Sequence, residues 1–133
     1  MSQKHAGSCL CGEVRYAFEG TFERFYLCHC LHCRKGTGSA HSAHLFSSST
    51  RLSWLAGRAS VTSYWLPGTR HVRNFCATCG SALPVMGDDG TVVPAGSLDT
   101  AVSRVPDGNI VTASRAPWDH DLPAAPDFPT FPT

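Results

Sequence analysis

The seven cysteines of this 133-residue chain are the residues whose type and spacing suit metal chemistry. They form three short groups, namely Cys9 and Cys11, then Cys28, Cys30 and Cys33, and finally Cys76 and Cys79. Two thiolates two or three positions apart can bind one metal ion, and four satisfy the tetrahedral coordination of structural zinc. Seven cysteines divide into a closed set of four and a set of three with one open coordination position, the pattern of a structural and a catalytic zinc.

The spacing also indicates which cysteines share an ion. The group from Cys28 to Cys33 is compact enough to hold one ion alone, whereas each of the two outer pairs needs two more ligands. We therefore expect the four-cysteine site to join the distant pairs. Such a site closes a loop of about 65 residues, and restraining a long loop contributes more to stability than restraining a short one.

Disulfide bonds are the alternative use of these cysteines. The odd number of cysteines weakens that alternative, and no apolar run follows Met1, so we expect no secretory signal and a cytoplasmic location. A redox dithiol at Cys76 and Cys79 would need a βαβ pattern around it, which the sequence lacks. Zinc binding is the prediction that these observations favour.

Composition limits the other classes of function. The length suits one domain, and a formal net charge of +1 with 16% charged residues predicts no nucleic-acid partner. No apolar run approaches the roughly 20 residues of a membrane-spanning helix. We expect a zinc-binding domain over residues 1–121 and a proline-rich tail over 122–133, in which Phe128 and Phe131 are candidates to contact the domain or a neighbouring subunit of a homo-oligomer.

The pattern of apolar residues predicts an all-β fold with little helix. Alternation over 13–19 places Val14, Tyr16 and Phe18 on one face of a strand. Further strands are predicted at 25–27, 40–46, 60–66, 69–75, 83–86, 91–95 and 110–112. Helix is expected only near 31–35 and 98–102, so the three-cysteine group lies on a strand end and the turn after it.

Three segments resemble the signatures of the glutathione-dependent formaldehyde-activating enzyme family, which includes centromere protein V. They are GSCLCGEVRY at 7–16, CHCLHCRKGTG at 28–38 and FCATCGS at 75–81. The resemblance implies a β-tent fold of packed antiparallel sheets with two zinc ions. It also implies a structural site formed by Cys9, Cys11, Cys76 and Cys79 and a catalytic site formed by Cys28, Cys30 and Cys33.

The activity implied by the resemblance is carbon-sulfur bond formation between glutathione and formaldehyde, giving S-hydroxymethylglutathione. Arg34 and Lys35 follow the third catalytic cysteine and are candidates to bind a carboxylate of the thiol, although a solvated basic pair on a turn is the alternative. Many members carry a histidine where this chain has Asn109 in a late strand. If Asn109 stands at that position, a substrate-facing or acid-base group is missing.

A zinc-stabilised binding module without turnover is the competing interpretation. The fourth ligand of the second zinc discriminates between the two, because a side chain that closes the site favours a scaffold and an open position favours an enzyme. His44 and His71 are candidates for that ligand. His29, between two cysteines of an extended segment, is expected to point away and pack beside the site, with zinc ligation as the alternative.

Overall fold

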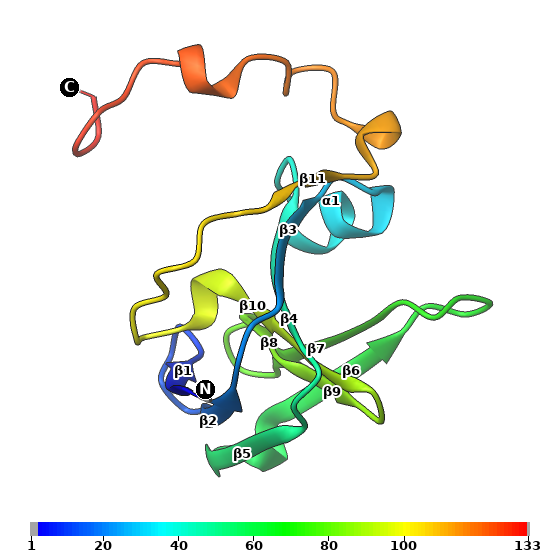
Figure 1. Cartoon of the computed structure of the whole chain (residues 1–133), viewed down its shortest axis with the longest axis vertical. Coiled ribbons are helices and arrows are strands. Elements are labelled where there is room, and N and C mark those ends of the chain that lie inside the picture. Colours follow the sequence, from blue (N-terminus) through cyan, green and yellow to red (C-terminus); the bar gives the residue numbers. More distant parts are fainter. Residues whose placement is uncertain (1–2, 133) are drawn as a thin grey trace.

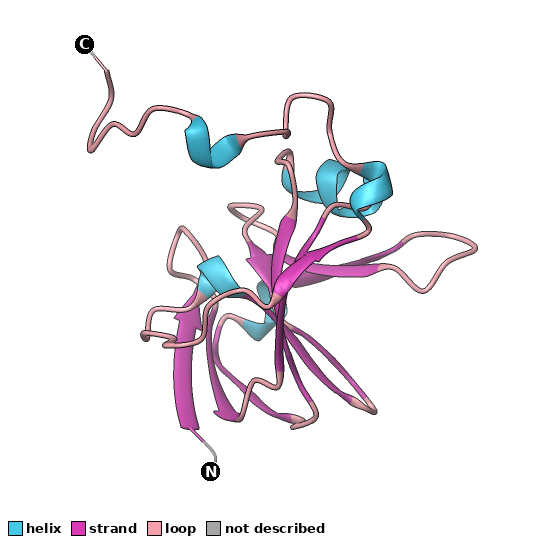
Figure 2. Ribbon diagram, turned by 45° about the horizontal axis from the view of Figure 1, so that its top comes forward, coloured by secondary structure: helices cyan, strands magenta, loops and turns pink. Residues whose placement is uncertain are grey.

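The computed structural model describes residues 3–132 and consists of three small β-sheets and one α-helix (Figures 1 and 2). The first sheet has the order β1 (Gln3–Ser8), β2 (Arg15–Gly20), β5 (Arg51–Ala56). The second has the order β11 (Gly108–Ile110), β3 (Arg24–Cys28), β4 (Ser42–Ser47), β10 (Gly90–Pro94), β9 (Val85–Gly87). The third has the order β6 (Val61–Trp65), β7 (Val72–Cys76), β8 (Ala82–Leu83).

Helical structure is confined to short segments. The α-helix α1 (Leu31–Thr37) follows β3 directly. Four 3₁₀ turns complete the described part of the chain: η1 (Arg58–Ser60), η2 (Ala95–Ser97), η3 (Thr112–Ser114) and η4 (Leu122–Ala124). The all-β prediction is therefore confirmed. Within residues 3–132, no helix has the length and apolar character needed to span a membrane.

The structure corrects the sequence-based elements in three places. The strands β1 and β5 were not predicted, although Leu52, Trp54 and Ala56 alternate along β5 with more exposed residues. The helix expected near 98–102 is wrong, because the backbone N–H groups of Asp99 and Thr100 donate to the Ala6 carbonyl of β1 instead of to their own segment. The sheets are also not entirely antiparallel, since β11 pairs with β3 in parallel.

The core lies on the predicted inner face of β2 and the residues before it. Tyr16 and Phe18 are fully buried and pack with Phe22, Leu45 and Val93, which joins the first two sheets. A second buried cluster contains Val14, Leu83, Cys9 and Cys76 and joins the first sheet to the third. Two of the predicted zinc ligands are thus part of the hydrophobic core.

The C-terminal tail leaves the sheets after residue 119 and extends away from them (Figure 1). Its residues up to 132 are exposed. Phe128 and Phe131 keep 60% and 92% of their surface exposed. Neither side chain packs against the domain, which was one of the two contacts expected of them. A contact with a neighbouring subunit remains a prediction.

Gly57 provides a test of the junction between β5 and η1. Its backbone is left-handed, with φ of 72°, and a Cβ atom there would lie 2.2 Å from the carbonyl oxygen of Glu13, beside the first cysteine pair. We expect Gly57→Ala to lower the free energy of unfolding by at least about 2 kcal/mol, from backbone strain plus the clash. Urea denaturation measures it. Gly87→Ala, where the Cβ meets nothing within 4 Å, is the control; equal losses in the two variants would contradict the prediction.

Candidate functional site

Four cysteines from two distant turns meet between the first and third sheets. The turn after β1 carries Cys9 and Cys11. Cys76 ends β7 and Cys79 lies in the turn between β7 and β8, so the two distant pairs meet as the spacing predicted. Their sulfur atoms all lie within 4.8 Å of one another. The N–H of Leu10 donates to the Ser81 hydroxyl at 2.9 Å, so the two turns are also joined directly.

The geometry of this four-cysteine cluster fits a tetrahedral metal ion. Sulfur atoms bound to one zinc at about 2.3 Å lie about 3.8 Å apart. Here the Sγ atoms of Cys9 and Cys11 are 3.5 Å apart and those of Cys11 and Cys76 are 3.9 Å apart. A disulfide needs about 2.05 Å, and all seven cysteines are free thiols. The set therefore has the donor type and spacing that zinc requires.

Hydrogen bonding prepares one member of the four-cysteine cluster for metal binding. The Ser81 hydroxyl, followed by the backbone N–H groups of Cys11 and Ser81, lowers the pKa of Cys79 to about 5. In the group of Cys28, Cys30 and Cys33, burial first and then the neighbouring Cys30 raise the pKa of Cys33 to about 12. A divalent cation would offset both effects, because it stabilises the thiolate form.

The second cluster is local. Cys28 ends β3, Cys30 is the N-cap of α1, and Cys33 is buried in the first turn of that helix. The N–H of Cys33 donates to the Sγ of Cys30 at 3.3 Å. All three sulfur atoms lie within 4.8 Å of one another. The strand end and the helix start therefore supply all members of this three-cysteine cluster from one short segment of the chain.

No fourth side chain completes the three-cysteine cluster in the described part of the chain. Within residues 3–132, no histidine, aspartate, glutamate or further cysteine offers a ligand atom within 4.8 Å of all three sulfur atoms. His44 and His71, the candidates for a fourth ligand, line the neighbouring cavity instead. The cluster thus offers a metal ion three side-chain ligands, as expected for a site with one open coordination position.

His29 is held between two side chains of the C-terminal third. Its Nε2 lies 2.8 Å from Oδ1 of Asn109, and its Nδ1 lies 3.1 Å from Oδ2 of Asp119. Asp119 in turn lies 3.5 Å from Nε of Arg115. Nε2 of this buried histidine is hydrogen-bonded to Asn109, whereas Nδ1 lies near the Asp119 carboxylate without hydrogen-bond geometry. His29 therefore packs beside the site, as expected. Asn109, where the resemblance suggested a histidine, serves as one of these partners.

The chain reverses direction after β11 to reach His29. The N–H of His29 donates to the Ile110 carbonyl at 2.9 Å, which joins β11 to the three-cysteine loop. Val111 has a left-handed backbone with φ of 55°, uncommon for a β-branched residue. This bend and the following 3₁₀ turn return residues 115–119 over the loop, where Ala116 and Asp119 are buried. Asp119 was not predicted to lie at the site, because no local pattern in the sequence marks it.

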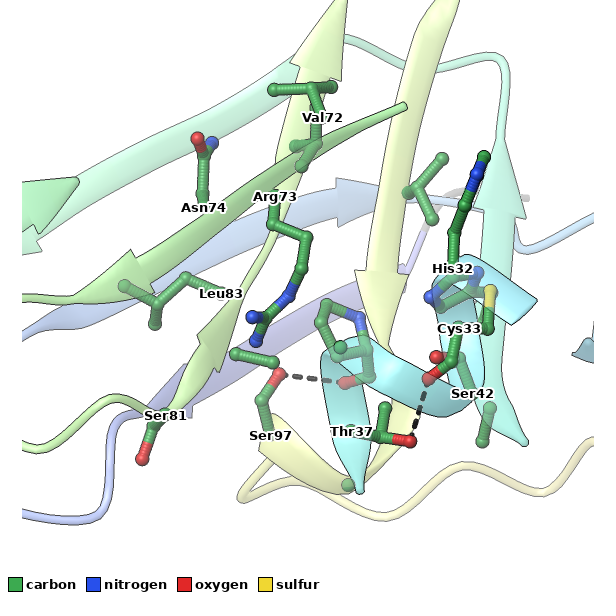
Figure 3. A pocket seen from close by; sticks show the side chains of 18 of the residues that line it. His32, Cys33, Thr37, Ser42, Val72, Arg73, Asn74, Ser81, Leu83 and Ser97 are labelled. Atoms are coloured by element: carbon green, nitrogen blue, oxygen red, sulfur yellow. Dashed lines mark hydrogen bonds between the residues drawn. The ribbon is translucent and has the colours of Figure 1, made fainter. Parts of the chain in front are cut away.

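A cavity of about 900 Å³ lies between the two clusters (Figure 3). Cys33 and Thr37 of α1 line one side, and Cys9, Ser81 and Leu83 line the side toward the four-cysteine cluster. Its ionisable lining is mainly basic: Arg70, Arg73, His32, His41, His44 and His71, with Asp99 as the acidic member. Asp99 accepts a hydrogen bond from the Ser8 hydroxyl at 2.7 Å. The cavity therefore combines an open cysteine cluster with a basic wall.

Arg34 and Lys35, the predicted carboxylate contacts, are placed differently. Arg34 donates to the Ser114 carbonyl at 3.1 Å, which helps to hold η3 against α1. Lys35 is exposed, and neither residue belongs to the cavity lining. Their contact with a carboxylate stays a prediction.

The two clusters predict unequal effects of cysteine substitution. We expect Cys79→Ser to lower the free energy of unfolding by several kcal/mol, roughly 3 or more, because the four-cysteine cluster joins two sheets and belongs to the core. Cys30→Ser changes only a local loop and should cost at most about 1 kcal/mol in the protein with its metal. Thermal unfolding of both variants measures the difference. Equal losses of stability would show that the clusters do not have separate roles.

Asp119 provides a second prediction. Replacing it by alanine removes the acidic neighbour of the buried His29 and of the half-exposed Arg115, so Asp119→Ala should lower the free energy of unfolding by about 1–3 kcal/mol. It should also speed removal of metal from the three-cysteine cluster by a chelator, by about tenfold. Asp127→Ala, in the exposed tail, is the matched control. An unchanged rate of metal loss would mean that His29 does not position the cluster.

Comparison with known proteins agrees with this geometry. The crystal structure of a Rhodobacter sphaeroides protein superimposes with a TM-score of 0.59 at 24% sequence identity, covering 76% of this chain and 97% of that one, and supports the fold. The family model for glutathione-dependent formaldehyde-activating enzymes matches residues 4–114, which include all seven cysteines. The chain belongs to the glutathione-dependent formaldehyde-activating enzyme family.

Proposed function

We propose that the chain is a zinc-dependent enzyme of the carbon-sulfur lyase type, acting on the adduct of a thiol such as glutathione with a small aldehyde such as formaldehyde. The membership of the family supports the thiol and the aldehyde. The observation that supports an enzyme rather than a scaffold is the three-cysteine cluster, which lacks a fourth side-chain ligand within residues 3–132 and borders a cavity of about 900 Å³. Structural zinc sites use four protein ligands, and catalytic ones keep a position open.

In this proposal the two clusters hold zinc for different purposes. The four-cysteine cluster, Cys9, Cys11, Cys76 and Cys79, holds a structural ion that joins two sheets. The three-cysteine cluster, Cys28, Cys30 and Cys33, holds the second ion at the cavity. When bound, that second zinc supplies an open coordination position that accepts a thiol and favours its ionised form.

The protein contributes position and a bounded space. His29, fixed between Asn109 and Asp119, orients the loop that carries Cys28 and Cys30. The cavity has the volume of a typical small-molecule site, on the order of 300–1,000 Å³, and suits a tripeptide thiol together with a one-carbon aldehyde. Holding both reactants beside Cys33 raises their effective concentration, which accelerates a reaction that otherwise depends on collision.

The reaction is an addition without oxidation or reduction. The thiol sulfur forms a bond to the aldehyde carbon, the carbonyl π bond opens, and the proton lost by the thiol is returned to the former carbonyl oxygen. The product is a hydroxymethyl thioether, and the reverse reaction breaks the same carbon-sulfur bond.

A reducing cytoplasm is the compartment we propose, because it keeps the seven thiols available to metal.

Metal analysis and a rate measurement together test the proposal. Protein made with sufficient zinc should contain about two ions per chain. It should accelerate exchange between glutathione with formaldehyde and S-hydroxymethylglutathione, measured by exchange NMR above the uncatalysed rate. Cys30→Ser should lose that acceleration by about 100-fold or more while the four-cysteine cluster keeps its ion.

The possible results separate the two candidate functions. Two zinc ions without any acceleration and without thiol binding would favour the non-catalytic binding module. One ion per chain after zinc has been added back would contradict the two-site proposal. Acceleration with another thiol or aldehyde, but not with glutathione and formaldehyde, would keep the reaction type and change the substrate.

A further inference from the structure

Arg73 presents an unpartnered guanidinium to the cavity. It lies on β7, and its side chain extends from that strand into the space toward α1 (Figure 3). Within residues 3–132 the guanidinium has neither a carboxylate nor a hydrogen-bond acceptor as a partner. Its Cζ atom lies over the ring of Phe75, two residues along the strand, at 5.7 Å from the ring centroid, so the guanidinium packs on an aromatic face. A half-buried cation without an acceptor is suited to a ligand that brings one.

Gly36 places this guanidinium close to the three-cysteine cluster. A Cβ atom at Gly36 would lie 3.1 Å from Cδ and 3.3 Å from Nε of Arg73, so the arginine occupies the space left by the missing side chain. Gly36 is three residues after Cys33 on α1, and side chains three apart on a helix have Cβ atoms about 5–6 Å from one another. Nε of Arg73 is therefore within about 9 Å of the Cys33 Cβ.

That separation matches a thiol that carries a carboxylate. A chain residue spans at most about 3.3–3.6 Å, so a carboxylate one or two residues from a cysteine lies within about 4–7 Å of it. A ligand with its sulfur at the three-cysteine cluster can therefore reach the neighbourhood of Arg73 with such a carboxylate. The planar guanidinium can receive both carboxylate oxygens at once.

The wall around Arg73 is lined by basic residues, of which Arg70 and Arg73 carry positive charge at neutral pH. Burial first, and then the charges of His32 and Arg73, lower the pKa of His71, so these groups lie close enough to repel one another. The rings of His32 and His71 are 5.0 Å apart. Arg70 lines the same wall, and the acidic Asp99 is engaged by Ser8. An anion entering the cavity is therefore attracted to the wall that carries Arg73.

We propose that Arg73 binds a carboxylate of the thiol substrate and thereby makes the site selective for carboxylated thiols over neutral ones. This inference rests on the proposed function, because it assumes that the thiol sulfur is held at the three-cysteine cluster. It assigns the carboxylate contact to β7, in place of the basic pair Arg34 and Lys35 that follows the cluster in sequence. A packing role on Phe75 alone is the alternative for Arg73.

Binding to the zinc-loaded protein tests the assignment with three probes measured by calorimetry. Glutathione has both thiol and carboxylates, mercaptoethanol has the thiol alone, and S-methylglutathione has the carboxylates alone. Arg73→Gln should lower the affinity for glutathione about 10- to 100-fold, which is the loss expected for a charge-assisted contact. The affinity for mercaptoethanol should stay within about twofold of the wild-type value. Arg73→Lys should restore part of the affinity. Arg58→Gln, an exposed arginine outside the cavity lining, is the control and should change neither.

Each outcome separates this inference from the proposed function. The inference is overturned if Arg73→Gln lowers the affinities for glutathione and mercaptoethanol equally, or lowers neither. It is also overturned if Lys35→Gln, and not Arg73→Gln, loses the preference for glutathione. If the wild type binds no thiol but binds S-methylglutathione through Arg73, the thiol function fails and the carboxylate contact stands. If the wild type binds none of the three probes, both fail.

Discussion

The convergence of four cysteines from two distant turns is the constraint on which the rest of the structure depends. Cys9 and Cys11 leave the first sheet, Cys76 and Cys79 leave the third, and their sulfur atoms must share one small volume. Cys9 and Cys76 are buried with Val14 and Leu83, so the same contact closes the second core cluster. Because these turns also carry cavity-lining residues, the position of the cavity wall follows from the position of the cluster.

The three-cysteine cluster depends on a different kind of support. Its ligand residues come from one strand end and one helical turn, which fix their spacing but not their orientation relative to the rest of the protein. That orientation comes from residues far along the chain, through Asn109 and Asp119 on either side of His29. A polar group of three side chains centred on a buried histidine, such as this one, stabilises the fold only while all three members are present. The C-terminal segment is therefore part of the site although it contributes no ligand.

Much of this arrangement could be predicted from the sequence, because the signals were local. The division of the cysteines followed from count and spacing, and the inner face of β2 followed from the alternation of Val14, Tyr16 and Phe18. Arg73 could not be identified, because one arginine in a strand has no local mark that distinguishes it from the eight others. Its proposed role depends on packing against Gly36 of α1, a tertiary contact. The helix predicted near residue 98 was wrong for a similar reason, because backbone N–H groups of that segment donate to the Ala6 carbonyl of β1.

The two clusters differ in how much of the chain must be ordered before they exist. Cys28, Cys30 and Cys33 are neighbours in an unfolded chain, so bringing them together costs little loop entropy. Cys11 and Cys76 are 65 residues apart, and their cluster forms only when two sheets have assembled. During folding we therefore expect a metal ion to enter the local cluster first, while the cluster that stabilises the fold acquires its ion last. If both clusters take up zinc as proposed, chain topology sets the kinetic order of metal acquisition, and the ion on which the fold depends more is the later one.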